Sequence, residues 1–271
     1  MSQDTVKASL NYTQDIGRPI DYYFYEPEPG TQKDESGTDL KEVEVHNGWP
    51  NVNDFSLDKQ GFELKDFTTT FDKFDDDAAL KEKFYSEVIA FVKKETGAKE
   101  VVVFDHTVRK RLPDDLKQQT EASRPAVLLV HSDYTAKSAQ QRVKDIMGDR
   151  ADELLSKRVA FYNVWKPLYE TVEELPLAMC DATTSTDDDF LLMNLKYSDR
   201  TGEIYVVRHS PQHRWFYFPR MTPKNALLLK TYDSEGDGRA RFTPHTAFED
   251  PNTPQNALKR QSIEIRTMAF F

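Results

Sequence analysis

A short motif of histidine and carboxylate is the first place in this chain where side chains could do chemistry. The segment Val130-His131-Ser132-Asp133 ends an apolar run of β-forming residues. Because side chains alternate between the two faces of a strand, His131 and Asp133 point one way and Ser132 points the other. An imidazole nitrogen and a carboxylate oxygen on one face are two ligands for a divalent metal. A second histidine from a distant strand would complete a 2-His-1-carboxylate iron site.

A second group of polar residues lies near the C-terminus, shortly after His245. If residues 260–266 form a strand, every second side chain faces the same way. The side chains on one of these faces are Arg260, Ser262, Glu264 and Arg266. Arginines that face the interior of a barrel are costly unless they hold a buried anion. A dicarboxylate such as 2-oxoglutarate is such an anion, because a guanidinium group can bind a carboxylate through two parallel hydrogen bonds.

Several further segments carry a family resemblance. They read DHTVR at 105–109, NVWKPL at 163–168, PLAMCDA at 176–182, HSPQHRW at 209–215, YDS at 232–234 and PHTAF at 244–248. With the order His-x-Asp, later His and then Arg-x-Ser, they resemble the Fe(II)/2-oxoglutarate-dependent oxygenases. Within these the chain is most similar to the fungal hydroxylase/desaturase family, which resembles gibberellin desaturase and the smaller cephem-methoxylase component. The resemblance runs from roughly residue 8 to the end.

The resemblance implies a site and an activity. It implies that His131, Asp133 and His245 bind Fe(II), and that Arg260 and Ser262 bind the carboxylate of the co-substrate 2-oxoglutarate. The third reactant would be O2. The implied activity is hydroxylation, desaturation or a related C–H oxidation of a small-molecule natural product, within fungal secondary metabolism.

Alternatives remain open at several positions. His209 or His213 could replace His245 as the third ligand. The stretch from His245 to Arg260 is longer than usual for this superfamily, so Arg266 competes with Arg260 for 2-oxoglutarate. Two other functions compete with the oxygenase: a cupin-like metalloenzyme that does not use 2-oxoglutarate, and a non-catalytic helper protein of a two-component oxygenase.

The elements that must position these residues are short strands. We expect strands at residues 101–104, 126–130, 159–162, 190–195, 203–207, 214–218, 226–229 and 262–271, because these runs are β-rich and turn signals separate them. Helices are expected from the acidic residues 75–77 to Gly97, and from Ala136 to about Lys157. The fold class is therefore mainly β with flanking helices. Several short strands suggest a sandwich or barrel, and the family resemblance implies that it is a double-stranded β-helix (jelly roll). We expect one domain over residues 1–271, with residues 1–60 as an N-terminal wrap and a core from about residue 100.

Composition narrows the class of protein. The chain has 271 residues and a formal net charge of -10, which argues against a nucleic-acid partner because phosphate contacts need clustered Lys and Arg. No apolar run is long enough for a membrane helix. Cys180 is the single cysteine, so no intrachain disulfide can form, and we expect a protein of the cytoplasm. The sequence leaves a homodimer open.

Overall fold

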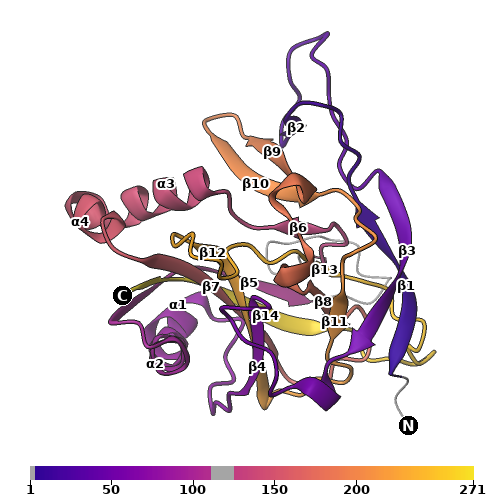
Figure 1. Ribbon diagram of the computed structural model, residues 1–271. Helices are drawn as coiled ribbons and strands as arrows, with labels where there is room; N and C mark the ends of the chain where they lie inside the picture. Colours follow the sequence, from indigo (N-terminus) through magenta and orange to yellow (C-terminus); the bar gives the residue numbers. More distant parts are fainter. Residues whose placement is uncertain (1–3, 111–124) are drawn as a thin grey trace.

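The architecture is a pair of facing β-sheets with helices on the outside (Figure 1). The computed structural model describes residues 4–110 and 125–271. Within these ranges one sheet has the strand order β1-β3-β11-β8-β13-β6-β10-β9-β2, and the other has the order β4-β12-β7-β14-β5. Neighbouring strands run antiparallel except in the pairs β3–β11 and β2–β9. The predicted jelly-roll class is confirmed.

The strand bounds show which segments each sheet joins. The larger sheet consists of β1 (Thr5–Tyr12), β2 (Ile20–Tyr23), β3 (Asp39–Asn47), β6 (His131–Ser132), β8 (Leu177–Cys180), β9 (Phe190–Lys196), β10 (Thr201–Val207), β11 (Trp215–Tyr217) and β13 (His245–Ala247). The smaller sheet consists of β4 (Phe62–Asp66), β5 (Glu100–Lys110), β7 (Val159–Pro167), β12 (Asn225–Asp233) and β14 (Gln261–Phe270). Each sheet therefore combines strands that are far apart in the sequence.

Apolar side chains fill part of the space between the two sheets. Trp165 and Leu227 from the smaller sheet pack in one cluster with Met179 and Phe216 from the larger sheet. On the opposite face of the smaller sheet, Ile263 packs in a separate apolar cluster with residues of the first helical region. The smaller sheet is thus covered on both faces, so its inner face can carry a water-excluding site.

The first helical region begins and ends where the sequence predicts. It consists of α1 (Asp77–Ala79), a wider π-type turn (Leu80–Phe84) and α2 (Tyr85–Thr96). The Asp76 carboxylate accepts a hydrogen bond from the backbone N–H of Ala79, at 3.0 Å. Gly97 ends the helix at φ +73°, a left-handed conformation that glycine adopts without a steric penalty.

The second helical region differs from the prediction. Instead of one helix from Ala136 to about Lys157, there are two, α3 (Ala136–Met147) and α4 (Ala151–Leu155). A short 3-10 turn (Gly148–Arg150) separates them, and it starts at Gly148 with φ +54°. The break is local: glycine supplies a backbone conformation that interrupts the regular helix.

The expected strand at residues 126–130 is wrong, because within the described residues 125–135 only His131 and Ser132 form a strand. The residues before it bond irregularly to two different neighbours. The Leu128 carbonyl oxygen accepts from the Asn11 side chain at 2.8 Å, and the Val127 carbonyl oxygen accepts from the Ala247 N–H at 2.9 Å. A segment divided between two partners in this way makes no continuous ladder.

The N-terminal part contains regular strands as well as loops. Within residues 4–60 there are three strands. All of β1 pairs antiparallel with Asp39–His46 of β3, and β3 also lies beside β11 in the larger sheet. The segment around β2 projects from the body of the molecule (Figure 1). Its exposed aromatic residues include Tyr22, Phe24 and Tyr25.

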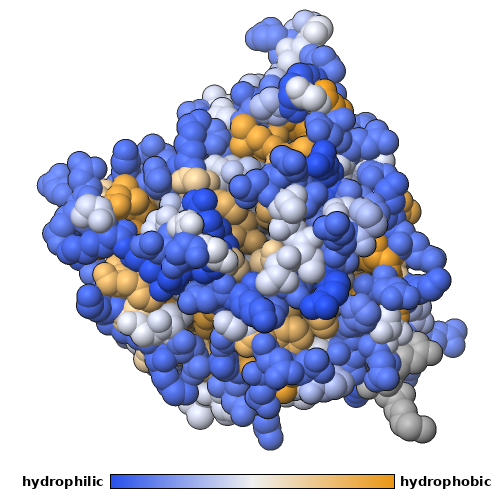
Figure 2. Space-filling model, viewed as in Figure 1, coloured by the Kyte–Doolittle hydropathy of each residue, from blue (hydrophilic) through white to orange (hydrophobic). Residues whose placement is uncertain are grey.

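The surface is largely hydrophilic in the view of Figure 2, with apolar side chains gathered near β2 and β9. Among the described residues, no helix is both long enough and apolar enough to span a bilayer.

Candidate active site

Two histidines meet at the centre of the larger sheet. His131 on β6 and His245 on β13 are direct cross-strand partners, and their ring centroids lie 4.4 Å apart. Residues more than a hundred positions apart are brought together by this strand pairing. The structure therefore places the predicted third ligand beside the first.

Asp133 joins the two histidines from the same face as His131. Its Oδ1 lies 3.6 Å from His131 Nε2, and its Oδ2 lies 4.0 Å from His245 Nε2. One ligand atom from each residue lies within 4.8 Å of the others, and no other such group of three occurs in residues 4–110 and 125–271. Two ligand atoms that are each about 2.1 Å from a metal ion lie about 3 Å from each other. A small inward shift of the three side chains would therefore allow them to bind an ion.

The tautomers of both histidines suit metal binding. His131 Nδ1 donates to the Leu129 carbonyl oxygen at 2.7 Å, and His245 Nδ1 donates to the Thr243 carbonyl oxygen at 3.0 Å. A proton held on Nδ1 leaves the Nε2 lone pair free, and that nitrogen faces Asp133 in each case. Two neutral imidazole nitrogens and one carboxylate oxygen are the donor set that Fe(II) accepts, so the residues present fit the metal.

The charges of Asp133 and His245 agree with this donor set. Burial disfavours the charged form of His131, yet its contact with Asp133 raises the pKa of that imidazole, so a metal ion bound there would displace a proton. Burial acts against the ionised form of Asp133, yet the hydrogen bond with His131 and the nearby Arg266 lower the pKa of its carboxyl group. Burial, together with His131, lowers the pKa of His245. The carboxylate is therefore charged and His245 neutral at pH 7, which is the protonation state that a metal needs.

Asn163 on β7 fixes the Asp133 carboxylate. Its Nδ2 donates to Asp133 Oδ2 at 2.5 Å, while its Oδ1 is buried without a hydrogen-bond partner among the described residues. The sequence patterns did not assign Asn163 to the site. Because side chains alternate along a strand, Asn163 lies on the same inner face of β7 as the buried Trp165. The sequence could not show that this face of β7 lies against Asp133.

The two arginines proposed for the co-substrate lie in β14 (Arg266) and directly before it (Arg260). Arg260 is buried, donates to the Leu175 carbonyl oxygen, and lies with its guanidinium 5.7 Å from the Trp165 ring centroid. Burial lowers its pKa to about 10, and the nearby Arg109 contributes to that shift. Ser262 Oγ, two residues along the same face, is buried and has no partner among the described residues.

Arg266 is held by carboxylates of the protein. It donates to Asp105 Oδ2 at 2.9 Å and to Thr107 Oγ1 at 3.0 Å, and it also donates to Glu264 Oε1. Although burial opposes it, the charges of Glu264 and Asp133 raise the pKa of Arg266. The positive charge of Arg266 is therefore already paired with carboxylates of this chain. This makes Arg266 less suited than Arg260 to bind an external dicarboxylate.

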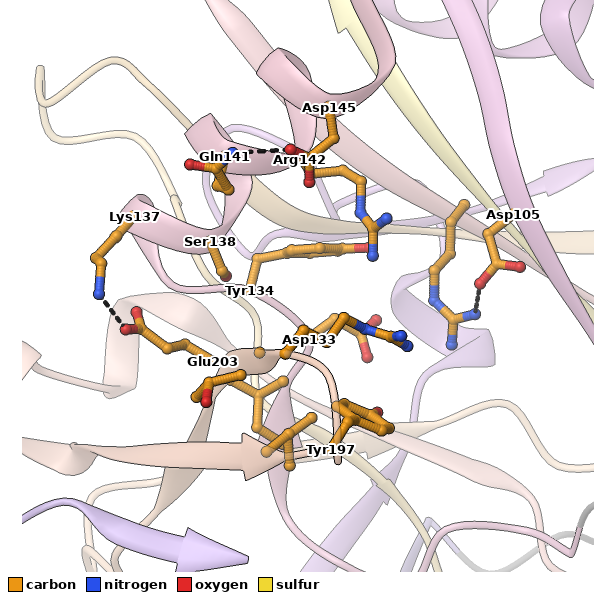
Figure 3. A pocket seen from close by; sticks show the side chains of 16 residues that line it. Asp105, Asp133, Tyr134, Lys137, Ser138, Gln141, Arg142, Asp145, Tyr197 and Glu203 are labelled. Carbon is orange, nitrogen blue, oxygen red and sulfur yellow. Dashed lines mark hydrogen bonds and ion pairs between the residues drawn. The ribbon is translucent and has the colours of Figure 1, made fainter. Parts of the chain in front are cut away.

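A cavity of about 400 Å³ opens beside Asp133. Its walls come from α3, from β9 and β10 with the turn between them, and from Arg266 and Asp105. Figure 3 shows the Tyr134 ring and the Arg142 side chain on one side and Asp133 at the base. An ion pair between Lys137 of α3 and Glu203 of β10 connects two walls of the cavity. The contribution of α3 was not predictable from the sequence, because nothing in that helix distinguishes these residues from an ordinary solvated face.

His209 and His213 lie in a different cluster. His213 Nδ1 is 3.2 Å from the Tyr12 hydroxyl, and its Nε2 is 3.4 Å from Asp189 Oδ2. The His209 ring packs edge-on against Tyr12, with centroids 5.1 Å apart. Neither histidine belongs to the group formed by His131, Asp133 and His245.

Comparison with known proteins agrees with this geometry. A family model described as "Oxidoreductase/YMDC permease-like domain" matches residues 10–270. The chain is 33% identical to the hydroxylase/desaturase efuI of Hormonema carpetanum, over 98% of this chain and 95% of that protein. It is 32% identical to the Fe(II)/2-oxoglutarate-dependent dioxygenase nvfI of Aspergillus novofumigatus, over 92% of this chain and 90% of that protein.

Solved structures give the same result. The iron and alpha-ketoglutarate-dependent endoperoxidase NvfI superposes with a TM-score of 0.89 at 26% sequence identity, covering 99% of each chain. The dioxygenase nvfI and the endoperoxidase NvfI depend on iron and 2-oxoglutarate, which the cupin-like and helper-protein alternatives would not require. The chain belongs to this oxidoreductase family and is a fungal-type Fe(II)/2-oxoglutarate-dependent oxygenase, an enzyme that uses Fe(II), 2-oxoglutarate and O2.

Proposed function

We propose that His131, Asp133 and His245 are the iron ligands of this oxygenase. The observation that carries the proposal is the convergence of His131 Nε2, His245 Nε2 and the Asp133 carboxylate. Iron bound there would supply the activation of O2, coupled to oxidation of 2-oxoglutarate, that removes hydrogen from a substrate C–H bond. The protein's own residues hold the ligands in place: Asn163 orients Asp133, and two backbone carbonyl groups orient the imidazoles.

Arg260 and Ser262 are the residues that we assign to 2-oxoglutarate. Two features support Arg260 over Arg266. The carboxylates of Glu264 and Asp105 already pair with Arg266. The unpartnered hydroxyl group of Ser262 lies two residues from Arg260 on the same face, and a buried hydroxyl group without a partner is costly unless a ligand completes it.

The cavity beside Asp133 is the proposed substrate site. Its volume of about 400 Å³ falls in the usual range for sites that bind small organic molecules. The substrate class that we propose is a small natural product of fungal secondary metabolism, whose reactive C–H bond the cavity walls orient toward the iron ligands. Hydroxylation, desaturation and related oxidations would differ in how these walls place that bond.

An anaerobic titration tests the assignment. Addition of Fe(II) and then 2-oxoglutarate should produce the weak visible charge-transfer band of chelated 2-oxoglutarate. We expect the band to be lost in His245→Ala and Arg260→Ala and to be retained, at somewhat weaker 2-oxoglutarate affinity, in Arg266→Ala. Loss of the band in Arg266→Ala with retention in Arg260→Ala would reverse the assignment of the two arginines.

The aspartate provides a second test. Asp133→Ala removes one of the three ligands and should abolish turnover while the protein remains folded. A well-folded Asp133→Ala protein with normal activity would contradict the iron assignment. Circular dichroism of the purified variant supplies the control for folding.

We also propose that the protein acts in the cytoplasm and forms a homodimer through its exposed aromatic segment. Its single cysteine, Cys180, is buried and unpaired, which suits a reducing compartment. Tyr22, Phe24 and Tyr25 are exposed beside the apolar patch near β2 and β9. Light scattering should give the mass of a dimer for the wild type and the mass of a monomer for Phe24→Ser. A monomeric wild type would exclude the dimer. A fluorescent fusion tests the location.

A further inference from the structure

The segment that delivers His245 is held by a distant turn, residues 56–61. This turn closes on itself, since the Ser56 carbonyl oxygen accepts from the backbone N–H groups of Gln60 at 2.9 Å and Gly61 at 3.0 Å. Two of its own carbonyl groups then accept hydrogen bonds from the segment 234–244. The Asp58 carbonyl oxygen accepts from the Ala240 N–H at 2.8 Å, and the Gly61 carbonyl oxygen accepts from the Thr243 hydroxyl at 3.1 Å.

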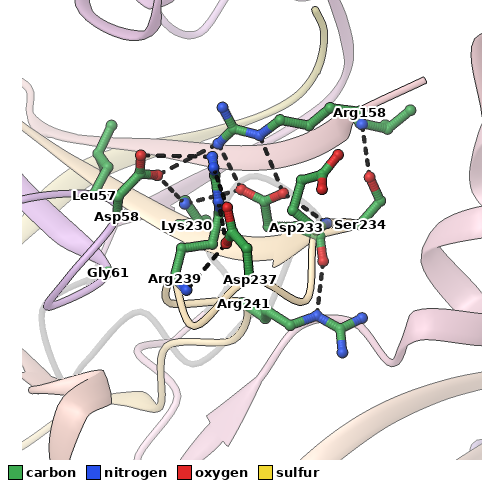
Figure 4. Close-up of polar contacts among 12 residues, drawn as sticks. Leu57, Asp58, Gly61, Arg158, Lys230, Asp233, Ser234, Asp237, Arg239 and Arg241 are labelled. Carbon is green, nitrogen blue, oxygen red and sulfur yellow. Dashed lines mark hydrogen bonds and ion pairs between the residues drawn. The ribbon is translucent and has the colours of Figure 1, made fainter.

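Buried charges fasten the turn to the smaller sheet (Figure 4). Lys230 on β12 is fully buried and donates to Asp58 Oδ1 at 2.6 Å and to Asp233 Oδ2 at 2.9 Å. Arg158 binds the same Asp233 carboxylate through two nitrogens, at 3.2 Å and 2.7 Å. The Lys230–Asp233 ion pair is buried and therefore fixed in place, and the more exposed Asp58 carboxylate ties the turn to it.

Close approach of the backbone at Gly61 completes the connection. Gly61 has φ +87°, and a methyl group there would overlap Thr243 Oγ1 and lie 3.2 Å from its Cβ and 3.3 Å from its Cγ2. Its carbonyl oxygen also accepts from the Lys230 N–H at 2.8 Å. Only glycine allows Thr243 to approach this closely.

Thr243 connects the turn to the metal site. Its side chain is held by Gly61, and its carbonyl oxygen accepts from His245 Nδ1 at 3.0 Å. Thr243 and His245 are both buried, at 0% and 2% exposure, so neither has an alternative partner in water. A displacement of Thr243 therefore changes the orientation of the His245 ring and the direction of its Nε2 lone pair.

We propose that Gly61 and Thr243 are positioning residues for His245. This inference rests on the proposed iron ligands. The residues act on metal affinity through the hydrogen bond to Nδ1 and touch neither substrate nor metal. Loss of such outer contacts typically weakens metal binding by about 10- to 100-fold.

The test is Co(II) affinity, measured by its visible absorption, in Gly61→Ala and in a matched control. Gly30→Ala is the control because Gly30 has φ +89° and open space around it, so it introduces the same backbone strain without a clash. We expect about tenfold weaker Co(II) binding in Gly61→Ala and unchanged binding in Gly30→Ala. Equal affinities in the two variants, at similar melting temperatures, would overturn the proposal.

A double variant and an isostere extend the test. Thr243→Ala removes the atoms that a methyl group at position 61 would overlap, so Gly61→Ala/Thr243→Ala should recover the affinity of Thr243→Ala alone. If Gly61→Ala fails to fold, Thr243→Val, which loses only the hydroxyl group, replaces it; unchanged Co(II) affinity in that variant would refute the inference. Wild-type protein that binds no Co(II) would instead refute the proposed iron ligands.

Discussion

At the scale of single residues, a buried hydroxyl group is the clearest candidate for a contact with the co-substrate. Ser262 is fully buried on the inner face of β14, and its Oγ has no partner among the residues that the structure describes. Ser132 is equally buried and also lacks a partner, but it points away from the site formed by its two neighbours. This pair allows the role of a ligand contact to be separated from the cost of burial.

We predict that Ser262→Ala raises the KM for 2-oxoglutarate about tenfold or more, because a hydrogen bond to a charged group contributes about 1.5–3 kcal/mol. Metal affinity should not change. Ser132→Ala is the matched control and should leave this KM unaltered. The same increase in both variants would mean that the Ser262 hydroxyl group does not contact the co-substrate. Steady-state kinetics at saturating iron measures the effect.

At the scale of elements, α2 and the turn before it protect the outer face of the smaller sheet. Phe84 is 1% exposed and packs with its ring near Phe67, Phe71 and Phe74. Phe84→Ala should destabilise the protein by about 3–5 kcal/mol through lost burial and the remaining cavity. Urea unfolding measures this, with the exposed Lys81→Ala as control. A loss below about 1 kcal/mol would show that the helix contributes little to the fold.

Asp189, in the 3-10 turn before β9, should make the stability of the fold depend on pH. Burial acts against ionisation of Asp189, yet hydrogen bonds from the Thr186 N–H and hydroxyl lower the pKa of its carboxyl group below the ordinary 3.8. The folded state thus binds a proton less readily than the unfolded state. This stabilisation is present above about pH 4 and is lost as the pH falls through the folded pKa.

Asp189→Asn should therefore lower stability at pH 7 and flatten its loss below about pH 4, because a neutral amide at position 189 does not titrate. Asp187→Asn, at an exposed position of the same turn, serves as control and should leave the profile unchanged. Thermal unfolding at several pH values measures both. A steeper acid loss in Asp189→Asn than in the wild type would contradict the predicted direction of the pKa shift.

At the scale of the whole molecule, the site connects both sheets. The proposed iron ligands lie in and beside β6 and β13 of the larger sheet, and the residues proposed for 2-oxoglutarate lie in and beside β14 of the smaller one. A ligand set that spans both sheets should stabilise the entire fold when occupied. Co(II) with 2-oxoglutarate, each at about 100 times its Kd, should raise the melting temperature by several degrees. His245→Ala should show no such rise, and a rise of equal size there would place the metal elsewhere.

Some features followed from local sequence alone. The face shared by His131 and Asp133 and the polar face of residues 260–266 depend only on strand alternation, which is a property of neighbouring residues. The start of the first helical region at Asp76 and its end at Gly97 were likewise predictable, because capping and positive φ act within a few residues. The family resemblance added the jelly roll and the co-substrate.

Other features were decided only by the tertiary structure. His209, His213 and His245 were equivalent candidates by residue type, and strand pairing placed His245 alone opposite His131. Arg260 and Arg266 share a face, and the pairing of Arg266 with Asp105 on the neighbouring strand is the reason for proposing Arg260 as the 2-oxoglutarate contact. Gly61 gave no local sign of its contact with Thr243. In each case the deciding contact joins residues far apart in the chain, so a pattern of neighbouring residues carries no information about it.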